Sequence, residues 1–209
     1  MTVIILSSAY LAPVQYYTKL YSGIPIMEER HDHFVKQTYR NRCTIATAQG
    51  PLSLSIPVRH NGGEKICTGE VLISNHGKWR REHWHALVSA YDNSPYFAYY
   101  ADDFKTIYDQ DFERLVDFNE AMENLVCELL SIRINKQISD RYIHPGEDDT
   151  DMRELIRPKV KWDDPHFKAA PYYQVFQEKY GFLTNLSIVD LLFNMGPESR
   201  IVLRSSWIR

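Results

Sequence analysis

The stretch at residues 3–23, VIILSSAYLAPVQYYTKLYSG, decides the fold class. Its first four residues form a short, continuous apolar run, which is typical of a strand buried in the middle of a sheet. After Pro13 the chain has a helical pattern that stops at Gly23, and proline and glycine commonly flank a helix in this way. A buried strand followed directly by a helix predicts an α/β domain.

The same alternation continues along the chain. We expect a second strand at 32–36, a strand pair at 43–58 that turns near Gln49-Gly50-Pro51, helices at 78–91, 95–108 and 117–129, and a strand at 131–139. An apolar helix begins after Ser187 and ends before Gly196. These elements predict an α/β fold with a mixed sheet, flanking helices and a helical C-terminal part, in a single domain spanning residues 1–209.

Composition limits the possible functions. Hydrophobic residues make up 44% of the 209 residues and charged residues 24%, which suits one folded domain. A net charge of -3 argues against a nucleic-acid binder, and no apolar run reaches the roughly 20 residues that a membrane span needs. The three cysteines are odd in number and form no CxxC, which indicates reduced thiols and a cytoplasmic protein.

A dense cluster of long donor side chains precedes the strand pair. Its members, within seven residues, are Lys36, Tyr39, Arg40, Asn41 and Arg42. On a strand-like backbone the even spacing of Lys36, Arg40 and Arg42 would place them on one side, where guanidinium groups can grip a carboxylate or phosphate. The alternative is a solvated turn whose surface ion pairs contribute about 0–1 kcal/mol.

Two segments near the C-terminus are unusual. Residues 144–168 are acidic and punctuated by proline, so we expect a loop that is an insertion or a replacement. Asp190 and Asn194 share one face of the apolar helix after Ser187, and a buried carboxylate must be paired or hydrogen-bonded. We favour a capping box between Asp190 and Ser187, with an arginine from the donor cluster as the alternative partner.

The histidines and the known loop motifs give weaker signals. His83 lies on the apolar stripe of its helix, where it is either a hydrogen-bonded core residue or a general acid/base. No HExxH motif or cysteine ligand accompanies the histidines, so we expect no metal site. The sequence has no GxGxxG, GxxxxGK[ST] or GxSxG motif, and it does not identify a cofactor.

Four stretches carry a family resemblance: LSSAYLAPVQYYTKLYS (6–22), FVKQTYRNRCTI (34–45) with LSIPV (54–58), WRREHWHALVSAYDNSPYF (79–97) and YYQVFQEKYGFLTNLSIVDLLFNMGPES (172–199). In this order they resemble the WbqC-like family, of which this chain looks like a compact branch. Many members carry a His or Gln where this sequence has Ser7 and Ser8, and adjacent aspartates where it has Arg30 and His31.

Members of the family occur in bacterial surface-polysaccharide gene clusters. The resemblance therefore implies a cytoplasmic enzyme of O-antigen-type biosynthesis, a transferase that acts on a sugar nucleotide or a similar anionic donor. Under this hypothesis Lys36, Arg40 and Arg42 hold the anion, Asn41 orients the turn, Tyr10, Tyr39 and Trp79 stack on a base or sugar ring, and His83 is the general acid/base.

A second hypothesis is a non-enzymatic module that binds a metabolite or a partner protein, as a homo-oligomer such as a dimer. The departures at Ser7, Ser8, Arg30 and His31 favour it, because groups that could act as bases elsewhere in the family are replaced here. The large number of aromatic residues, 13% of the chain, also suits an interface.

Overall fold

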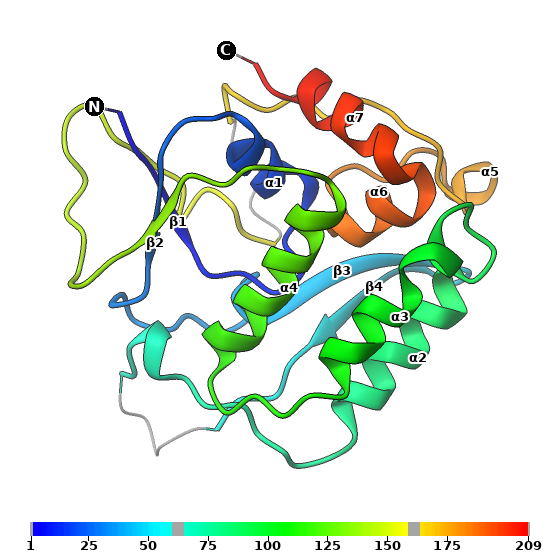
Figure 1. The fold of residues 1–209 in the computed structure, drawn as a ribbon, viewed down its shortest axis with the longest axis horizontal. Helices are drawn as coiled ribbons and strands as arrows, with labels where there is room; N and C mark the ends of the chain where they lie inside the picture. The colour runs from blue at the N-terminus through cyan, green and yellow to red at the C-terminus, as the bar shows by residue number, and fades with distance from the viewer. Residues whose placement is uncertain (1, 60–64, 159–163, 209) are drawn as a thin grey trace.

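The computed structural model describes residues 2–59, 65–158 and 164–208, and it shows an α/β fold (Figure 1). Four parallel strands lie in the order β5-β2-β1-β6, and a separate antiparallel hairpin pairs β3 with β4. The strands are β1 (Ile4–Ser7), β2 (Ile26–Glu29), β3 (Arg42–Thr47), β4 (Gly50–Ser55), β5 (Lys136–Ile138) and β6 (Thr150–Asp151). Parallel and antiparallel strands therefore occur together, as expected.

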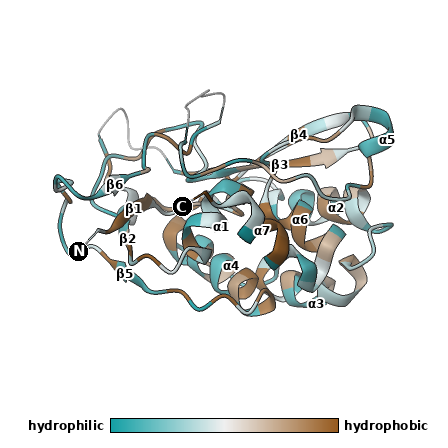
Figure 2. Cartoon of the chain, turned by 90° about the horizontal axis from the view of Figure 1, so that it is seen from above, coloured by the Kyte–Doolittle hydropathy of each residue, from teal (hydrophilic) through white to brown (hydrophobic). Residues whose placement is uncertain are grey.

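Helices make up most of the remainder. They are α1 (Val14–Tyr21), α2 (Trp79–Tyr91), α3 (Phe97–Tyr108), α4 (Leu115–Leu129), α5 (Gln177–Tyr180), α6 (Ile188–Met195) and α7 (Ser199–Ser206), with short 3-10 turns at η1 (Thr68–Glu70) and η2 (Gly196–Glu198). Seen from above, the parallel strands lie toward one side of the molecule and most of the helices toward the other (Figure 2). No helix in the described ranges is long and apolar enough to cross a bilayer.

The opening stretch folds as its sequence predicts. Ile4, Ile5 and Leu6 of β1 are at most 2% exposed, because β1 lies between β2 and β6. Helix α1 begins after Pro13 and ends before Gly23, whose φ of +79° is the left-handed conformation that glycine adopts easily. The strand–helix–strand unit β1-α1-β2 thus forms the centre of the parallel sheet.

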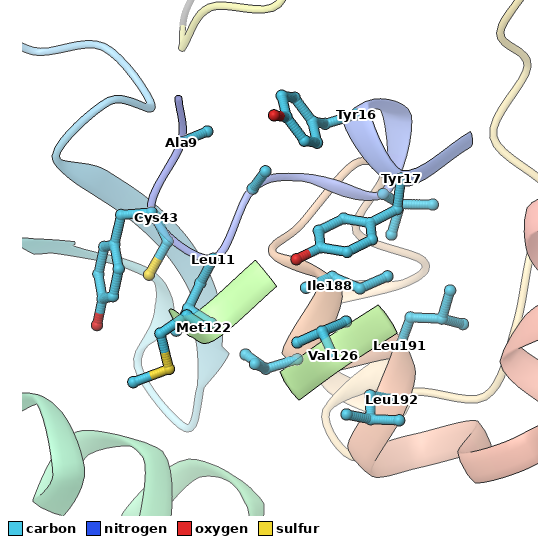
Figure 3. Close-up of a cluster of buried hydrophobic side chains, with 14 of the residues drawn as sticks. Ala9, Leu11, Tyr16, Tyr17, Cys43, Met122, Val126, Ile188, Leu191 and Leu192 are labelled. Carbon is cyan, nitrogen blue, oxygen red and sulfur yellow. The ribbon is translucent and has the colours of Figure 1, made fainter. Parts of the chain in front are cut away.

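The core lies where α1, α4 and α6 meet. Figure 3 shows Tyr17 of α1 next to Ile188 of α6, with Val126 of α4 and Leu191 of α6 close by. Helix α6 is apolar almost all round, and seven of its eight residues are buried. The prediction of a buried helix between Ser187 and Gly196 is therefore confirmed.

The second strand was predicted in the wrong place. Residues 32–36 contain only an isolated bridge at His33, residues 36–41 form turns and bends, and β2 lies earlier, at Ile26–Glu29. Its sequence, IMEE, ends in two glutamates that are both buried. A charged pair ordinarily indicates a surface loop, so the sequence pattern hid this strand. Glu28 pairs with Arg30, two residues away, and with the distant Lys136.

A cluster of buried charged residues joins β2 to β5 and α4. Lys136 Nζ lies 2.7 Å from a carboxylate oxygen of Glu28 and also pairs with Glu123. Tyr16 of α1 donates its hydroxyl proton to Glu123. Burial raises the pKa of Glu123. The cluster ties α1, β2, α4 and β5 together.

The acidic segment at 144–168 contains a strand that its composition did not predict. Residues Thr150 and Asp151 form β6, which pairs with Ile4 and Ile5 of β1. Residues 159–163 of the segment lie outside the described part of the chain. Helix α7 (Ser199–Ser206) also lay outside our predictions, because it follows a Gly-Pro pair that normally ends helical structure.

Asp190 forms neither of the two interactions that we expected. Ser187 does cap α6, since its hydroxyl accepts from Val189 N, but the Asp190 side chain does not close a capping box and meets no arginine. Its carboxylate accepts hydrogen bonds from Tyr91, Tyr172 and Gln174, at 2.7 to 2.9 Å. Burial raises its pKa. Asp190 therefore connects its own helix, α6, to α2 and to the chain before α5.

We predict that Asp190→Ala destabilises the fold by about 3–5 kcal/mol, because it leaves three buried donors without their acceptor. Urea unfolding measures the change. Asp109→Ala is the control: this carboxylate is exposed and pairs only with Lys105 four residues away, so its loss should cost below about 1 kcal/mol. Equal effects of the two substitutions would contradict this role of Asp190.

Gly196 sets the packing of α6 against α3. Its φ is +52°, and a Cβ there would lie 2.5 Å from the Tyr96 ring. We predict that Gly196→Ala costs more than about 2 kcal/mol in urea unfolding, through strain and the clash. Gly77→Ala, also at positive φ but with open space around it, should cost only about 1 kcal/mol. Adding Tyr96→Ala should lessen the effect of Gly196→Ala, and a purely additive double variant would exclude the clash.

Candidate functional site

Polar side chains gather where the parallel strands end. β1 ends at Ser7 and β2 at Glu29, while Ser139 follows β5 and Arg153 lies two residues after β6. Because the strands are parallel, their carboxyl ends lie along one edge of the sheet. Ligands of open α/β sheets bind outside this edge.

The strand order reverses between β1 and β6. The chain runs from β1 to β2 and on to β5 in one direction, and then returns to place β6 on the other side of β1 (Figure 2). The crevice at such a reversal is the usual binding position in this class of sheet. We call this place the switch point; it is formed by the carboxyl ends of β1 and β6.

A small cavity of about 20 Å³ lies at the switch point. It is lined by the residues that follow β1, by those that follow β6, and by the turn at 38–40. Tyr10 N donates to Tyr39 O, and this bond holds the turn against the chain that leaves β1. The cavity has room for little more than one water molecule.

Among the residues that line this cavity, three buried donor groups have no hydrogen-bond partner in the described part of the chain. They are the Ser7 hydroxyl, Arg40 Nε and Arg153 Nη1. The side chains of Arg40 and Arg153 are only 2% and 7% exposed. Buried polar groups normally have partners, so unused donors from separate segments indicate a place where an acceptor binds.

The neighbouring carboxylates already accept hydrogen bonds from the protein. Asp32 accepts from Arg40 Nη2 and from the Thr68 hydroxyl. Asp151 accepts from Arg153 Nε at 2.9 Å and from Nη2 at 2.7 Å. Burial opposes ionisation of Asp151, but the hydrogen bonds from Arg153 outweigh it and lower its pKa. Each arginine is thus fixed by one carboxylate and keeps a free N–H.

Glu29 organises the same edge from β2. One of its oxygens accepts from His31 N and the Ser139 hydroxyl, and the other accepts from Ile143 N. Arg153 Nη1 lies 3.5 Å from the second oxygen, too far for a good hydrogen bond. All three carboxylates therefore hold the edge in place. The cavity-lining groups that lack hydrogen-bond partners are N–H and O–H donors. Such a site suits an anion.

A comparison with known protein families shows which family the chain belongs to. The model of the WbqC-like protein family matches residues 9–160, more than half of the chain. The chain belongs to the WbqC-like family. The matched region contains the turn at 38–40, β6 and Arg153.

A curated relative supports this membership. The chain is 27% identical over 195 residues to the uncharacterized protein Rv1507c of Mycobacterium tuberculosis, a match that covers 82% of this chain and 84% of the relative. No solved structure gives a significant match.

The structure separates the cluster of donors that the sequence places together. In this WbqC-like protein Arg40 lines the switch point, whereas Lys36 is exposed in a turn. Arg42 lies on β3 and donates to the Ser55 hydroxyl, and Asn41 donates to Ile56 O. The expected shared face of a strand was wrong, because residues 36–41 form turns and bends.

Three other predicted residues meet in a different place. Tyr10, Trp79 and His83 form a buried cluster in which His83 lies against both rings, at centroid distances of 5.6 and 5.2 Å. The Tyr10 hydroxyl is 2.9 Å from His83 Nδ1 and also bonds to the Tyr108 hydroxyl. All are nearly inaccessible to solvent, so these rings offer no open surface to a ligand. Tyr39, half-buried, is the predicted aromatic residue that lines the switch point.

His83 is not protonated to the imidazolium form at neutral pH. Burial lowers its pKa to about 4, so the imidazole is uncharged. Its proposed part as a general acid/base stays a prediction, and undiminished turnover of His83→Ala would remove it. The observed contacts suit a hydrogen-bonded core histidine.

The sequence pattern did not identify Ser7 and Arg153 as site residues. Ser7 could have been found, since it directly follows the apolar run of β1. Arg153 lay in the acidic segment that we took for a loop, and only the pairing of β6 with β1 brings it to the edge. Among the described residues, no group of three or more His, Cys, Asp or Glu side chains is arranged to hold a metal ion.

Two larger hollows lie elsewhere on the surface. One, of about 550 Å³, lies between α2 and α3 and is lined by Arg80, Arg81, Trp84 and Lys105 among others. The other, of about 970 Å³, runs along β5 and the chain after it, from Gln137 to His144. We call these the helix cleft and the β5 groove.

His83 predicts a specific dependence of stability on pH. Its folded pKa of about 4 lies below its unfolded value near 6.5, so it contributes stability that is full above pH 6.5 and is lost as pH falls toward 4. For this residue alone we expect a loss of about 2 kcal/mol in urea unfolding between pH 7.5 and pH 5. His83→Gln should lessen the change by that amount, and His85→Gln, at an exposed position, should not.

Proposed function

We propose that this protein binds a sugar nucleotide, or a similar anionic donor, at the switch point and acts as a cytoplasmic transferase in bacterial surface-polysaccharide biosynthesis. The observation that carries the proposal is the set of unused donors on Ser7, Arg40 and Arg153 at the carboxyl edge of the sheet. Family membership supports the biosynthetic setting, through the gene clusters in which such proteins occur.

The arginines suit the chemistry of such a transfer. When a group leaves a sugar nucleotide, negative charge grows on the departing phosphate. Fixed guanidinium N–H groups in a buried site stabilise that charge without having to reorient. Arg40 and Arg153 are each held in a fixed position by a carboxylate, of Asp32 and Asp151 respectively.

One observation favours the second hypothesis, a module that binds without catalysis. Around the switch point the carboxylates of Asp32, Asp151 and Glu29 all accept hydrogen bonds from the protein, so each has a structural role there. Both hypotheses share the anion site. Release of free nucleotide from a sugar nucleotide, followed with time, separates them.

We expect nucleoside diphosphate sugars to raise the melting temperature of the protein in a concentration-dependent way. Arg153→Lys keeps the charge beside Asp151 but loses the planar fork, and Ser7→Ala removes one donor. Each should weaken binding by roughly tenfold in calorimetric titration, the effect of losing one hydrogen bond to a charged group. Arg200→Lys, an exposed residue of α7, is the matched control and should leave affinity unchanged.

Two further variants locate the anion if the switch point is wrong. Arg81→Ala changes the helix cleft, and Arg42→Ala changes the hairpin position expected from the sequence. Binding lost in either variant, but kept in Arg153→Lys and Ser7→Ala, would contradict the switch-point site. A melting temperature that follows protein concentration and ignores every nucleotide sugar would favour assembly in place of ligand binding.

A further inference from the structure

The cavity at the switch point is far smaller than a sugar nucleotide. Its volume of about 20 Å³ accommodates a few atoms of an anionic group. Small-molecule sites in proteins usually measure about 300–1,000 Å³. The β5 groove, with about 970 Å³, reaches that size. The remainder of a ligand held at the switch point therefore needs an adjoining space, and the β5 groove is a candidate.

Direct contacts join the two places. The Arg153 guanidinium, which lines the switch point, lies over the ring of Tyr142 in the groove, 5.3 Å from its centroid. Glu29 lies 3.5 Å from Arg153 and accepts from Ile143 N in the wall of the groove. A ligand contacting Arg153 is thus beside Tyr142.

The groove offers a flat aromatic and apolar surface. Tyr142 is 47% exposed and Ile138 46% exposed. His144 lies edge-on to Tyr142, with ring centroids 4.9 Å apart, and so fixes the orientation of the tyrosine ring. Exposed, oriented aromatic rings are the platforms on which proteins stack nucleobases.

The charges of the groove favour a neutral group over a phosphate. Asp140 and Arg141 are both strongly exposed, and their charged atoms are 4.0 Å apart, so they largely offset one another. At the switch point, next to Tyr142, the unused cationic donors are those of Arg153 and Arg40. The surface that suits a ring, in the β5 groove, and the donors that suit an anion, at the switch point, are therefore neighbours along the edge of the sheet.

We propose that the β5 groove binds the nucleoside of a nucleoside diphosphate ligand, with the base stacked on Tyr142 and the phosphates turned toward Arg153. This inference rests on the proposed function, and it assigns the two parts of the ligand to two parts of one site. The helix cleft does not serve the same ligand, because the fully buried Tyr10 and Tyr108 lie between it and the chain leaving β1.

Calorimetric titration with UDP, ADP, inorganic pyrophosphate and uridine tests the assignment. We expect UDP and ADP to bind the wild-type protein about tenfold more tightly than pyrophosphate, because stacking adds to the phosphate contacts. Tyr142→Ala should remove this tenfold advantage and leave pyrophosphate affinity unchanged. Tyr142→Phe, which keeps the ring, should retain it. Tyr99→Ala, at another exposed tyrosine, is the control for surface substitution.

The outcomes separate the two proposals. Arg153→Lys should weaken UDP and pyrophosphate alike, since both use the switch point. If pyrophosphate binds as tightly as UDP and Tyr142→Ala changes neither, the groove assignment is wrong while the anion site stands. If neither the nucleotides nor pyrophosphate binds, the proposed function itself fails, and the groove assignment with it.

Discussion

A single buried carboxylate, that of Glu29, holds the functional edge of the sheet together. Glu29 is fully buried at the end of β2, and its two oxygens accept from three segments: the chain after β2, the residue after β5 and the loop that follows. Arg153 approaches the same carboxylate from β6. Removing a buried carboxylate from such a network leaves several donors unsatisfied, so the shape of the edge and of the β5 groove depends on it.

The charged groups of this protein fall into two kinds. Lys136, buried beside Glu28 and Glu123, has its charge matched by carboxylates, and Asp190 has three donors. These clusters connect elements and leave little capacity unused. At the switch point the balance differs, because Arg40 and Arg153 each satisfy a carboxylate and still hold a buried N–H in reserve. Buried polar groups that lack hydrogen-bond partners occur most often at functional sites.

The sequence predicts more of the fold than of the site. Continuous apolar runs and helical periodicity identify β1, α1, α2, α4 and α6, because each buries its own apolar residues. They miss β2 and β6, which are short and carry charged residues that a local pattern assigns to a loop. Arg40 could be chosen as an anion ligand from its basic neighbours. Arg153 could not, since its place depends on strand order, which no local pattern encodes.

The pairing of β1 with β6 has a consequence for how the protein folds. Val3 N donates to Asp149, a contact that spans 146 residues, and the switch point lies at the end of the same strand pair. Contacts between such distant residues form late, because a long loop must close first. A chain emerging from the ribosome can therefore form the hairpin and the helix pairs well before it can hold an anion. A ligand bound at the switch point would therefore report completed folding and, by mass action, help to keep the loop closed.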